Sequence, residues 1–168
     1  MKKKSKLNKN LFYPVSKPKI YSSDIVEVNK ALKSGWISSD GPNVINFENK
    51  FSKFINRKYS IAVSNGTAAL EIAVKALGIK KGDEVLIPNF TIISNALAVI
   101  RQNAKPVFID CNLENWNIII EEIEKKITKK TKAIIITHIY SFPNDMDKIL
   151  KICRKNNIFV IEDAAEVL

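Results

Sequence analysis

The stretch that decides the fold lies between residues 59 and 78 and reads Tyr59-Ser-Ile-Ala-Val-Ser-Asn-Gly-Thr-Ala-Ala-Leu-Glu-Ile-Ala-Val-Lys-Ala-Leu-Gly78. Its first part is a short apolar run, residues 61–63, of the kind that forms a β-strand. Its second part carries apolar side chains at helical spacing, at Leu70, Ala73, Val74 and Leu77. Gly78 stands where a helix often ends in a left-handed residue. The pattern therefore predicts a strand, a polar turn and a helix from about Ala68 to Leu77.

The turn between strand and helix is made of small polar residues, Ser64, Asn65, Gly66 and Thr67. The first N–H groups of a helix have no partner within it and lie at its positive end, which suits a phosphate. Gly66 would let an anion approach the main chain, and Thr67 would add a hydroxyl donor while capping the helix. The alternative is a capped turn that binds no ligand.

Length and charge describe an ordinary globular chain with a basic start. The chain has 168 residues, enough for one domain with a core, and a formal net charge of +10. Five lysines lie within the first nine residues, and many others alternate with acids on predicted helix surfaces. We interpret the charge as a solvated arm over residues 1–20 and predict no nucleic-acid partner, because no basic stripe is interleaved with aromatic residues. A basic nucleic-acid-binding domain, the alternative, would rest on that arm alone.

Targeting and metal signals are weak. The Lys-rich start is not followed by the apolar segment of a signal peptide, and no run reaches the roughly 18–20 apolar residues of a membrane span. The two cysteines, Cys111 and Cys153, are isolated and are interpreted as reduced thiols. One histidine excludes a multi-histidine metal site. We expect a cytoplasmic protein with no metal site and no membrane partner.

The rest of the chain alternates between helices and strands. Two helices are expected before the turn, at residues 22–33 and 43–55, and the apolar stripe of the second (Val44, Phe47, Phe51 and Phe54) is interpreted as core packing. After the turn the expected strands are residues 84–88, 106–110, 132–138 and 158–163, and the expected helices are residues 91–101, 121–127 and 145–156. Continuous apolar strands alternating with amphipathic helices predict an α/β fold with a mostly parallel sheet covered on both faces.

Polar residues follow the strands at their carboxyl ends, where open α/β sheets bind ligands. They are residues 64–66, Pro88-Asn89, Asp110, Thr137-His138 and Asp163. Asp163 follows four apolar residues and Glu162, has no basic residue nearby in sequence and precedes the small Ala164-Ala165 pair. A buried carboxylate needs a cationic partner, and a protonated pyridine nitrogen would serve. With a phosphate at Gly66 and Thr67, this predicts pyridoxal phosphate (PLP). The alternative is that Asp163 only caps the following segment.

Six motifs in order resemble the DegT/DnrJ/EryC1/StrS aminotransferases, and within them the GDP-perosamine synthase-like members. They are Gly-Trp-Ile-Ser-Ser-Asp-Gly-Pro (35–42), Phe47-Glu48-Asn49-Lys50-Phe51, Ser-Asn-Gly-Thr-Ala-Ala-Leu (64–70), Gly-Asp-Glu-Val (82–85), Lys-Thr-Lys-Ala-Ile (130–134) and Ile-Glu-Asp-Ala-Ala-Glu (161–166). The resemblance extends from Tyr13 to the last residue. It implies the three-layer large domain of a fold type I PLP-dependent transferase, incomplete at the carboxyl end.

The resemblance also implies roles for matching residues. Gly66 and Thr67, with Asn65 in the same loop, would bind the cofactor phosphate, and Asp163 would pair with the pyridine nitrogen. Glu166 matches a polar residue near the cofactor's hydroxyl edge. Ile92 stands where the family usually places an aromatic ring over the cofactor, and Ser141 stands where it usually has glycine.

The resemblance further implies an enzyme that aminates a nucleotide-linked keto-sugar, with glutamate as the usual amino donor and an active site completed by a second subunit of a homodimer. The family's Schiff-base lysine lies downstream of the 161–166 motif, which places it beyond Leu168. We therefore expect no catalytic residue in this chain, and expect residues 21–168 to be the amino-terminal part of the large domain, without the small carboxyl-terminal domain. The alternative is a non-catalytic module, or an inactive split half, that retains the cofactor pocket.

Overall fold

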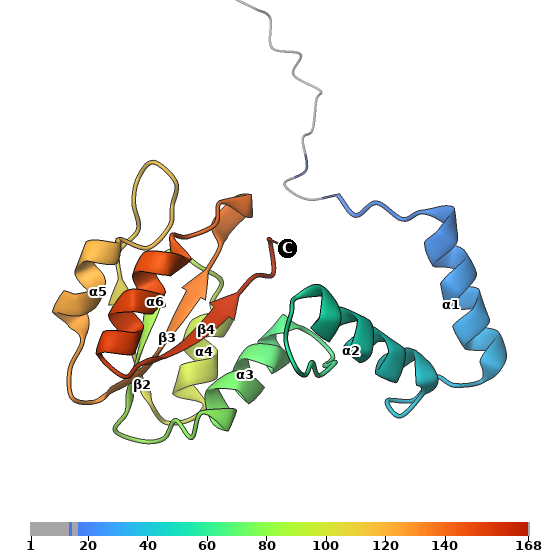
Figure 1. Ribbon diagram of the computed structural model, residues 1–168, viewed down its shortest axis with the longest axis horizontal. Coiled ribbons are helices and arrows are strands. Elements are labelled where there is room, and N and C mark those ends of the chain that lie inside the picture. Colours follow the sequence, from blue (N-terminus) through green and yellow to red (C-terminus); the bar gives the residue numbers. More distant parts are fainter. Residues whose placement is uncertain (1–13, 15–16, 168) are drawn as a thin grey trace, which may run out of the picture. The chain divides into compact units, whose positions relative to one another are not determined.

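The computed structural model describes residue 14 and residues 17–167 (Figure 1). The basic arm expected over residues 1–20 therefore lies mostly outside the described residues. Leu168, beyond which the resemblance places the Schiff-base lysine, also lies outside them. The expectation that the chain holds no catalytic residue thus stays a prediction.

The chain divides into two compact units, residues 1–62 and residues 63–168. Each unit is described by itself below. The prediction that residues 21–168 form part of one large domain stays a prediction.

The second unit is built on a parallel sheet. Its strands are β1 (Glu84–Pro88), β2 (Lys105–Ile109), β3 (Thr131–Thr137) and β4 (Phe159–Asp163), in the order β2-β1-β3-β4. All three pairings are parallel, with Leu86 of β1 opposite both Val107 and Ile134. The predicted parallel sheet is confirmed. Its β1 and β3 residues are almost fully buried because helices cover both faces.

Two apolar clusters show which helices cover each face. Helices α3 (Gly66–Ala76) and α4 (Ser94–Ile100) pack on one face, against the side chains of Val85, Ile87 and Ile135. Helices α5 (Ile120–Lys126) and α6 (Met146–Lys155) pack on the other, against alternate residues of the same strands such as Leu86, Ile134 and Ile136. Figure 1 shows α6 in front of the sheet and α4 behind it. Since side chains alternate along a strand, each strand contributes to both clusters, which gives the three-layer arrangement.

The strands and helices of this unit fall within a few residues of their predicted positions. A tight turn at Lys80–Asp83 precedes β1: the Asp83 N–H donates to the Lys80 carbonyl (3.1 Å) and the Lys80 N–H to the Asp83 carboxylate (3.0 Å). Gly78 is confirmed as the left-handed residue after α3, with φ 71°. Helix α4 begins at Ser94, three residues later than predicted, because the Thr91 hydroxyl bonds to the end of β3.

The predicted strand at residues 61–63 is wrong, because these residues form no strand. The Ala62 N–H donates to the Glu48 carboxylate (2.8 Å), so a side chain takes the hydrogen bond that a strand neighbour would receive. The predicted strand-turn-helix unit is therefore an irregular segment followed by α3.

The first unit contains helices α1 (Ser22–Ser34) and α2 (Pro42–Phe54), near their predicted positions. The interpretation of the α2 apolar stripe as core packing is wrong: Phe47 is 55% exposed and Phe54 71%. Their rings instead contact Phe51 along the helix, Phe47 in a stacked pair and Phe54 in a tilted one. Within this unit two helices are too few to enclose a core, and none of its described apolar side chains is buried.

Candidate cofactor site

The candidate site lies at the carboxyl edge of the sheet, beside the point where the strand order reverses. The chain passes from β1 to β2 on one side and then to β3 and β4 on the other, so the ends of β1 and β3 diverge into different loops. In open α/β sheets this is where ligands bind. The Thr91 hydroxyl, just after β1, donates to the Thr137 hydroxyl at the end of β3 (3.1 Å).

The start of α3 carries backbone N–H groups that could bind a ligand. Asn65 is the N-cap: its Oδ1 accepts from the Ala68 N–H at 2.9 Å. The prediction that Thr67 caps the helix is wrong, because Thr67 lies inside the first turn. Among the described residues the N–H groups of Gly66 and Thr67 have no acceptor. A Cβ placed on Gly66 would meet nothing within 4 Å, so the space beside these two donors is open.

A line of polar side chains runs from the start of α3 to the sheet. The Thr67 hydroxyl is 2.8 Å from the Ser94 hydroxyl at the start of α4. The next residue, Asn95, is fully buried and donates through Nδ2 to the hydroxyls of Thr91 and Thr137, both at 2.7 Å. Thr137 is the register partner of Asp163 on β4. These contacts place the two expected ends of the cofactor, Thr67 and Asp163, on the same side of the sheet.

Asp163 ends β4 as predicted, but its side chain is half-buried rather than fully buried. One carboxylate oxygen accepts from the Ala165 N–H at 3.2 Å, the local contact that the capping alternative requires. Among the described residues Asp163 forms no ion pair. It therefore retains an uncompensated negative charge at the ligand edge.

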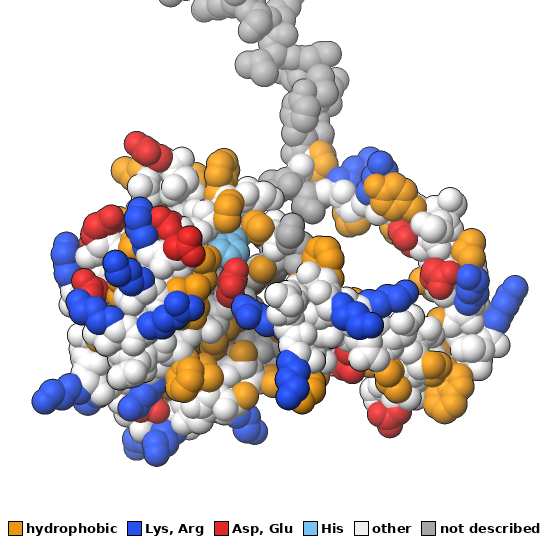
Figure 2. Space-filling model, viewed as in Figure 1, with side chains coloured by type: hydrophobic (Ala, Val, Ile, Leu, Met, Phe, Trp, Pro, Cys, Tyr) orange, Lys and Arg blue, Asp and Glu red, His pale blue; other side chains and the backbone are white. Residues whose placement is uncertain are grey.

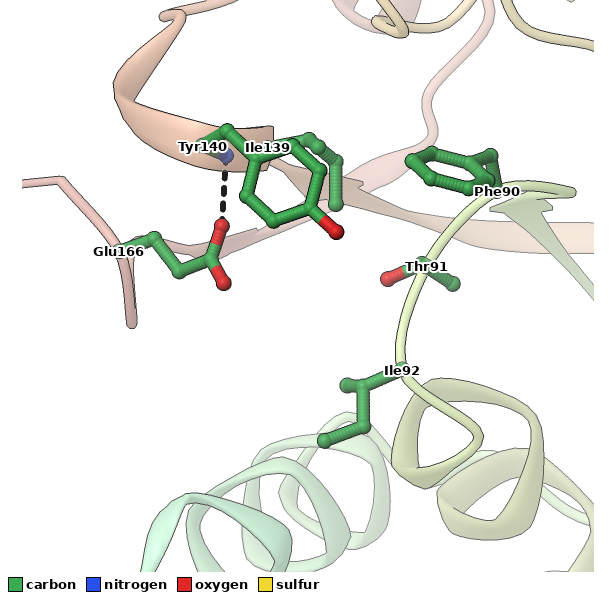
Figure 3. Close-up of a pocket in the computed structure, with 6 residues that line it drawn as sticks. All are labelled: Phe90, Thr91, Ile92, Ile139, Tyr140 and Glu166. Atoms are coloured by element: carbon green, nitrogen blue, oxygen red, sulfur yellow. Dashed lines mark hydrogen bonds between the residues drawn. The ribbon is translucent and has the colours of Figure 1, made fainter. Parts of the chain in front are cut away.

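The other two expected contacts, Ile92 and Glu166, line one open hollow of about 300 Å³, shown in Figure 3. Ile92 is 61% exposed in the loop between β1 and α4. One Glu166 oxygen accepts from the Tyr140 N–H at 2.6 Å. The remaining lining residues are Phe90, Thr91, Ile139 and Tyr140.

His138 lies on the opposite face from Asp163, although it follows Thr137 directly. Its Nε2 is 2.9 Å from the Glu162 carboxylate, and its Nδ1 accepts from the Asn144 N–H at 3.1 Å. With that donor at Nδ1, Nε2 carries the hydrogen that bonds Glu162. Alternation along β3 and β4 puts His138 and Glu162 together, away from Thr137 and Asp163. Asp110 also lies apart, at the end of the outer strand β2, where it accepts from the Cys111 N–H.

The residues at this edge of the sheet fit PLP at both its phosphate and its pyridine end. Two free N–H groups and a hydroxyl stand at the end assigned to the phosphate, and an unpaired carboxylate stands at the end assigned to the pyridine nitrogen. Asn95 Oδ1, buried and without a partner in the described structure, marks the polar layer beneath.

Sequence reasoning missed Ser94, Asn95 and Tyr140. Ser94 and Asn95 could have been found from the sequence, because they are among the polar residues of the segment 89–95, which follows a predicted strand.

Three further observations bear on other classes of site. No group of three or more His, Cys, Asp or Glu side chains that could hold a metal occurs among the residues described. None of the helices in the described ranges combines the length and apolar character needed to cross a bilayer. Figure 2 shows Lys and Arg side chains over the visible face of the second unit with Asp and Glu among them.

Known proteins resemble this chain in sequence and in fold. Residues 18–168 match the DegT/DnrJ/EryC1/StrS aminotransferase family. A GDP-perosamine synthase of Escherichia coli O157:H7 is 44% identical over 155 residues, which cover 92% of this chain and 43% of that protein. The crystal structure of an aminotransferase from Psychrobacter cryohalolentis aligns with a TM-score of 0.83 at 36% identity, over 92% of this chain and 40% of that one.

A third relative was solved with a ligand. A GDP-4-keto-6-deoxymannose-3-dehydratase, crystallised with PLP and glutamate trapped together, aligns with a TM-score of 0.86 at 27% identity, over 94% of this chain and 42% of that one. The chain thus spans about two-fifths of the length of these relatives. It belongs to the DegT/DnrJ/EryC1/StrS aminotransferase family.

Proposed function

We propose that this chain provides the phosphate and pyridine contacts of a PLP-dependent aminotransferase that acts on a nucleotide-linked keto-sugar in amino-sugar biosynthesis. The observation that carries the proposal is the alignment of free donors at Gly66 and Thr67 with the unpaired Asp163 carboxylate along one edge of the sheet. The family and the perosamine synthase relative support the substrate class. Because the chain spans two-fifths of its relatives' length, the activity, substrates and partners of the whole protein belong to this proposal.

Different residues of the chain would bind the two ends of the cofactor. The N–H groups of Gly66 and Thr67 and the Thr67 hydroxyl would hold the phosphate dianion at the positive end of α3. The Asp163 carboxylate would keep a proton on the pyridine nitrogen, because the ion pair stabilises the protonated form. Bound PLP supplies an electron sink for amino-group transfer. Ile92 would cover the ring with an aliphatic rather than an aromatic side chain.

The proposed setting of the reaction follows the relatives. We propose glutamate as the amino donor, which the relative trapped with PLP and glutamate supports. We also propose a homodimer acting in the cytoplasm, with the Schiff-base lysine supplied from beyond Leu168. The PLP site is the part of this proposal that the chain itself can test.

The test compares two ligands that differ only in phosphate. Pyridoxal phosphate and pyridoxal are titrated separately against the protein, and binding is followed by quenching of tryptophan fluorescence. Thr67→Ala removes one hydrogen bond to a charged group, worth about 1.5–3 kcal/mol. It should weaken pyridoxal phosphate binding by about tenfold or more and leave pyridoxal binding unchanged.

Asp163→Asn should show the complementary pattern. It should weaken both ligands by a similar factor and lower the pKa of the bound pyridine nitrogen, which ligand absorbance against pH reports. Asp110→Asn, at the end of β2, is the matched control and should change neither. Equal affinity of the wild-type protein for both ligands, or no effect of either site variant, would overturn the proposal.

A further inference from the structure

The segment opposite Ile92 in the hollow has an uncommon backbone. Tyr140 (φ 48°, ψ 42°) and Ser141 (φ 66°) are consecutive left-handed residues, and neither is glycine. This conformation costs free energy for residues with a Cβ and persists where surrounding contacts hold it. Such strain concentrates at ligand sites, so the contacts that maintain it indicate what the segment does.

Glu166 supplies those contacts from beyond β4. Its carboxylate accepts from the Tyr140 N–H at 2.6 Å, and its backbone carbonyl accepts from the Ser141 hydroxyl at 3.1 Å. Both bonds end on the two left-handed residues, which lie far from Glu166 in the sequence. An ionised acceptor makes the stronger kind of hydrogen bond, which suits a clamp on a strained peptide.

The held turn places an aromatic ring at the hollow. Figure 3 shows the Tyr140 ring between Glu166 and Phe90, with its hydroxyl on the side of Thr91. The Tyr140 and Phe90 ring centres are 6.4 Å apart in an edge-on arrangement, and Phe90 packs on Trp116 with centres 5.1 Å apart. Tyr140 nevertheless stays 53% exposed, and its hydroxyl has no partner among the described residues. An aromatic wall with a free hydroxyl beside an open hollow suits a flat, partly polar ring.

We propose that Tyr140 is a further ligand-contacting residue of this hollow and that Glu166 is its positioning residue, acting through the Tyr140 N–H. The identity of the flat ring, the pyridine of PLP, rests on the proposed function above. Glu166 thereby acts on the ligand through Tyr140, in addition to any direct contact expected from the family resemblance. The clamp itself depends only on the observed contacts.

The first measurement needs no ligand. Amide hydrogen exchange at Tyr140 is followed by NMR in the wild-type protein, Glu166→Ala and Glu166→Gln. Loss of the acceptor in Glu166→Ala should speed exchange by about tenfold, the worth of one hydrogen bond. Glu166→Gln keeps a side-chain oxygen but not the charge, so its exchange rate should lie between those of wild type and Glu166→Ala. Glu121→Ala, at an exposed position of α5, is the control and should match wild type. Equal exchange rates in wild type and Glu166→Ala would overturn the clamp.

The second measurement is a double-mutant cycle on the dissociation constant of pyridoxal phosphate. Glu166→Ala and Tyr140→Ala should each weaken binding several-fold. Because Glu166 acts in part through the Tyr140 ring, the loss of affinity in the double variant should be smaller than the sum of the two single losses. Tyr140→Phe keeps the ring and the backbone and should bind more tightly than Tyr140→Ala. It is the control for a Tyr140→Ala variant that binds weakly only because it is misfolded. Additive losses in the double variant, or Glu166→Gln matching Glu166→Ala, would overturn the positioning role.

The two proposals fail in different ways. Absence of pyridoxal phosphate binding to the wild-type protein would overturn the proposed function and the assigned ligand, while the exchange rates would still decide the clamp. Tight binding that Thr67→Ala weakens but Tyr140→Ala does not would retain the proposed function and overturn Tyr140 as a ligand contact.

Discussion

Cys153 of α6 packs within the apolar cluster that α5 and α6 form on the sheet, and this burial raises the pKa of its thiol to about 11. Cys111, after β2, is only half-buried. Since the thiolate is the reactive form, a raised pKa and poor access both slow the reaction of Cys153. We expect a disulfide reagent at pH 8 to modify Cys111 readily and Cys153 only after denaturation, as counted by absorbance with Cys111→Ser as the control. Rapid modification of two thiols in the native protein would contradict this.

The same shift gives Cys153 a pH dependence of known sign. Its pKa is higher in the folded than in the unfolded chain, so between about pH 8.5, the ordinary thiol value, and pH 11 the unfolded chain loses the proton first. Stability should therefore fall as pH rises through this window. Urea titrations at pH 8 and pH 10 should show a smaller drop for Cys153→Ala than for the wild-type protein. An identical drop in both would show that Cys153 does not contribute.

Helix α3 depends on its first residues for more than the proposed ligand site. Asn65 caps it through the bond to the Ala68 N–H, and its apolar side chains Leu70 and Val74 are buried. Asn65→Ala should lower the free energy of unfolding by about 1 kcal/mol, measured by urea denaturation without cofactor. Asn65→Asp keeps an acceptor and should cost much less. Equal losses for both variants would show that the cap hydrogen bond is not what stabilises the helix start.

The amino ends of three strands are joined around the buried carboxylate of Glu84. It accepts from the Thr128 hydroxyl (2.7 Å) in the loop before β3 and from Lys105 Nζ (3.2 Å) at the start of β2. The Thr128 hydrogen bond, followed by Lys105, holds the pKa of Glu84 below its ordinary value even though burial opposes this. The network thus favours the ionised side chain in the folded state.

A depressed folded pKa sets the direction of the pH effect. The stabilisation by Glu84 is present above the ordinary carboxyl pKa of about 4.3 and is lost as pH falls through the folded value, because the unfolded chain takes up the proton first. Melting temperatures between pH 7 and pH 3 should fall less steeply for Glu84→Gln than for the wild-type protein. Thr128→Val should raise the folded pKa and give an intermediate slope. Parallel slopes for all three proteins would refute this account.

Burial is unevenly distributed over the whole molecule. All the buried apolar side chains of the described residues lie at or after Leu70, in the second unit, whereas α1 buries no residue. Amides protected only by global unfolding exchange most slowly, while weakly packed helices open locally. Native-state hydrogen exchange should therefore find the slowest amides in β1 and β3 and exchange at least about a hundredfold faster in α1. Protection of α1 comparable to that of β3 would contradict this distribution of stability.

Local sequence was sufficient for most of the regular elements. The unbroken apolar runs of β1 and β3 and the helical spacing of α3 reflect burial against neighbours on known faces, so periodicity reports them directly. Gly78 was predictable because a left-handed helix end favours glycine. Asp163 and the Gly66-Thr67 turn were proposed as cofactor contacts from local patterns, a carboxylate after an apolar run and a polar helix start, and those roles stay predictions.

Only the tertiary structure decided which of the polar residues meet. The bond between Thr91 and Thr137 joins positions 46 residues apart, and that between Glu166 and Tyr140 joins positions 26 apart, so both depend on how the strands are ordered and in register. Register also separated His138 from Thr137, since neighbours on a strand face opposite ways. The exposure of Phe47 and Phe54 shows the same limit. An apolar stripe indicates a face suited to burial, but whether anything in its unit covers that face depends on packing between elements, which helical spacing does not encode.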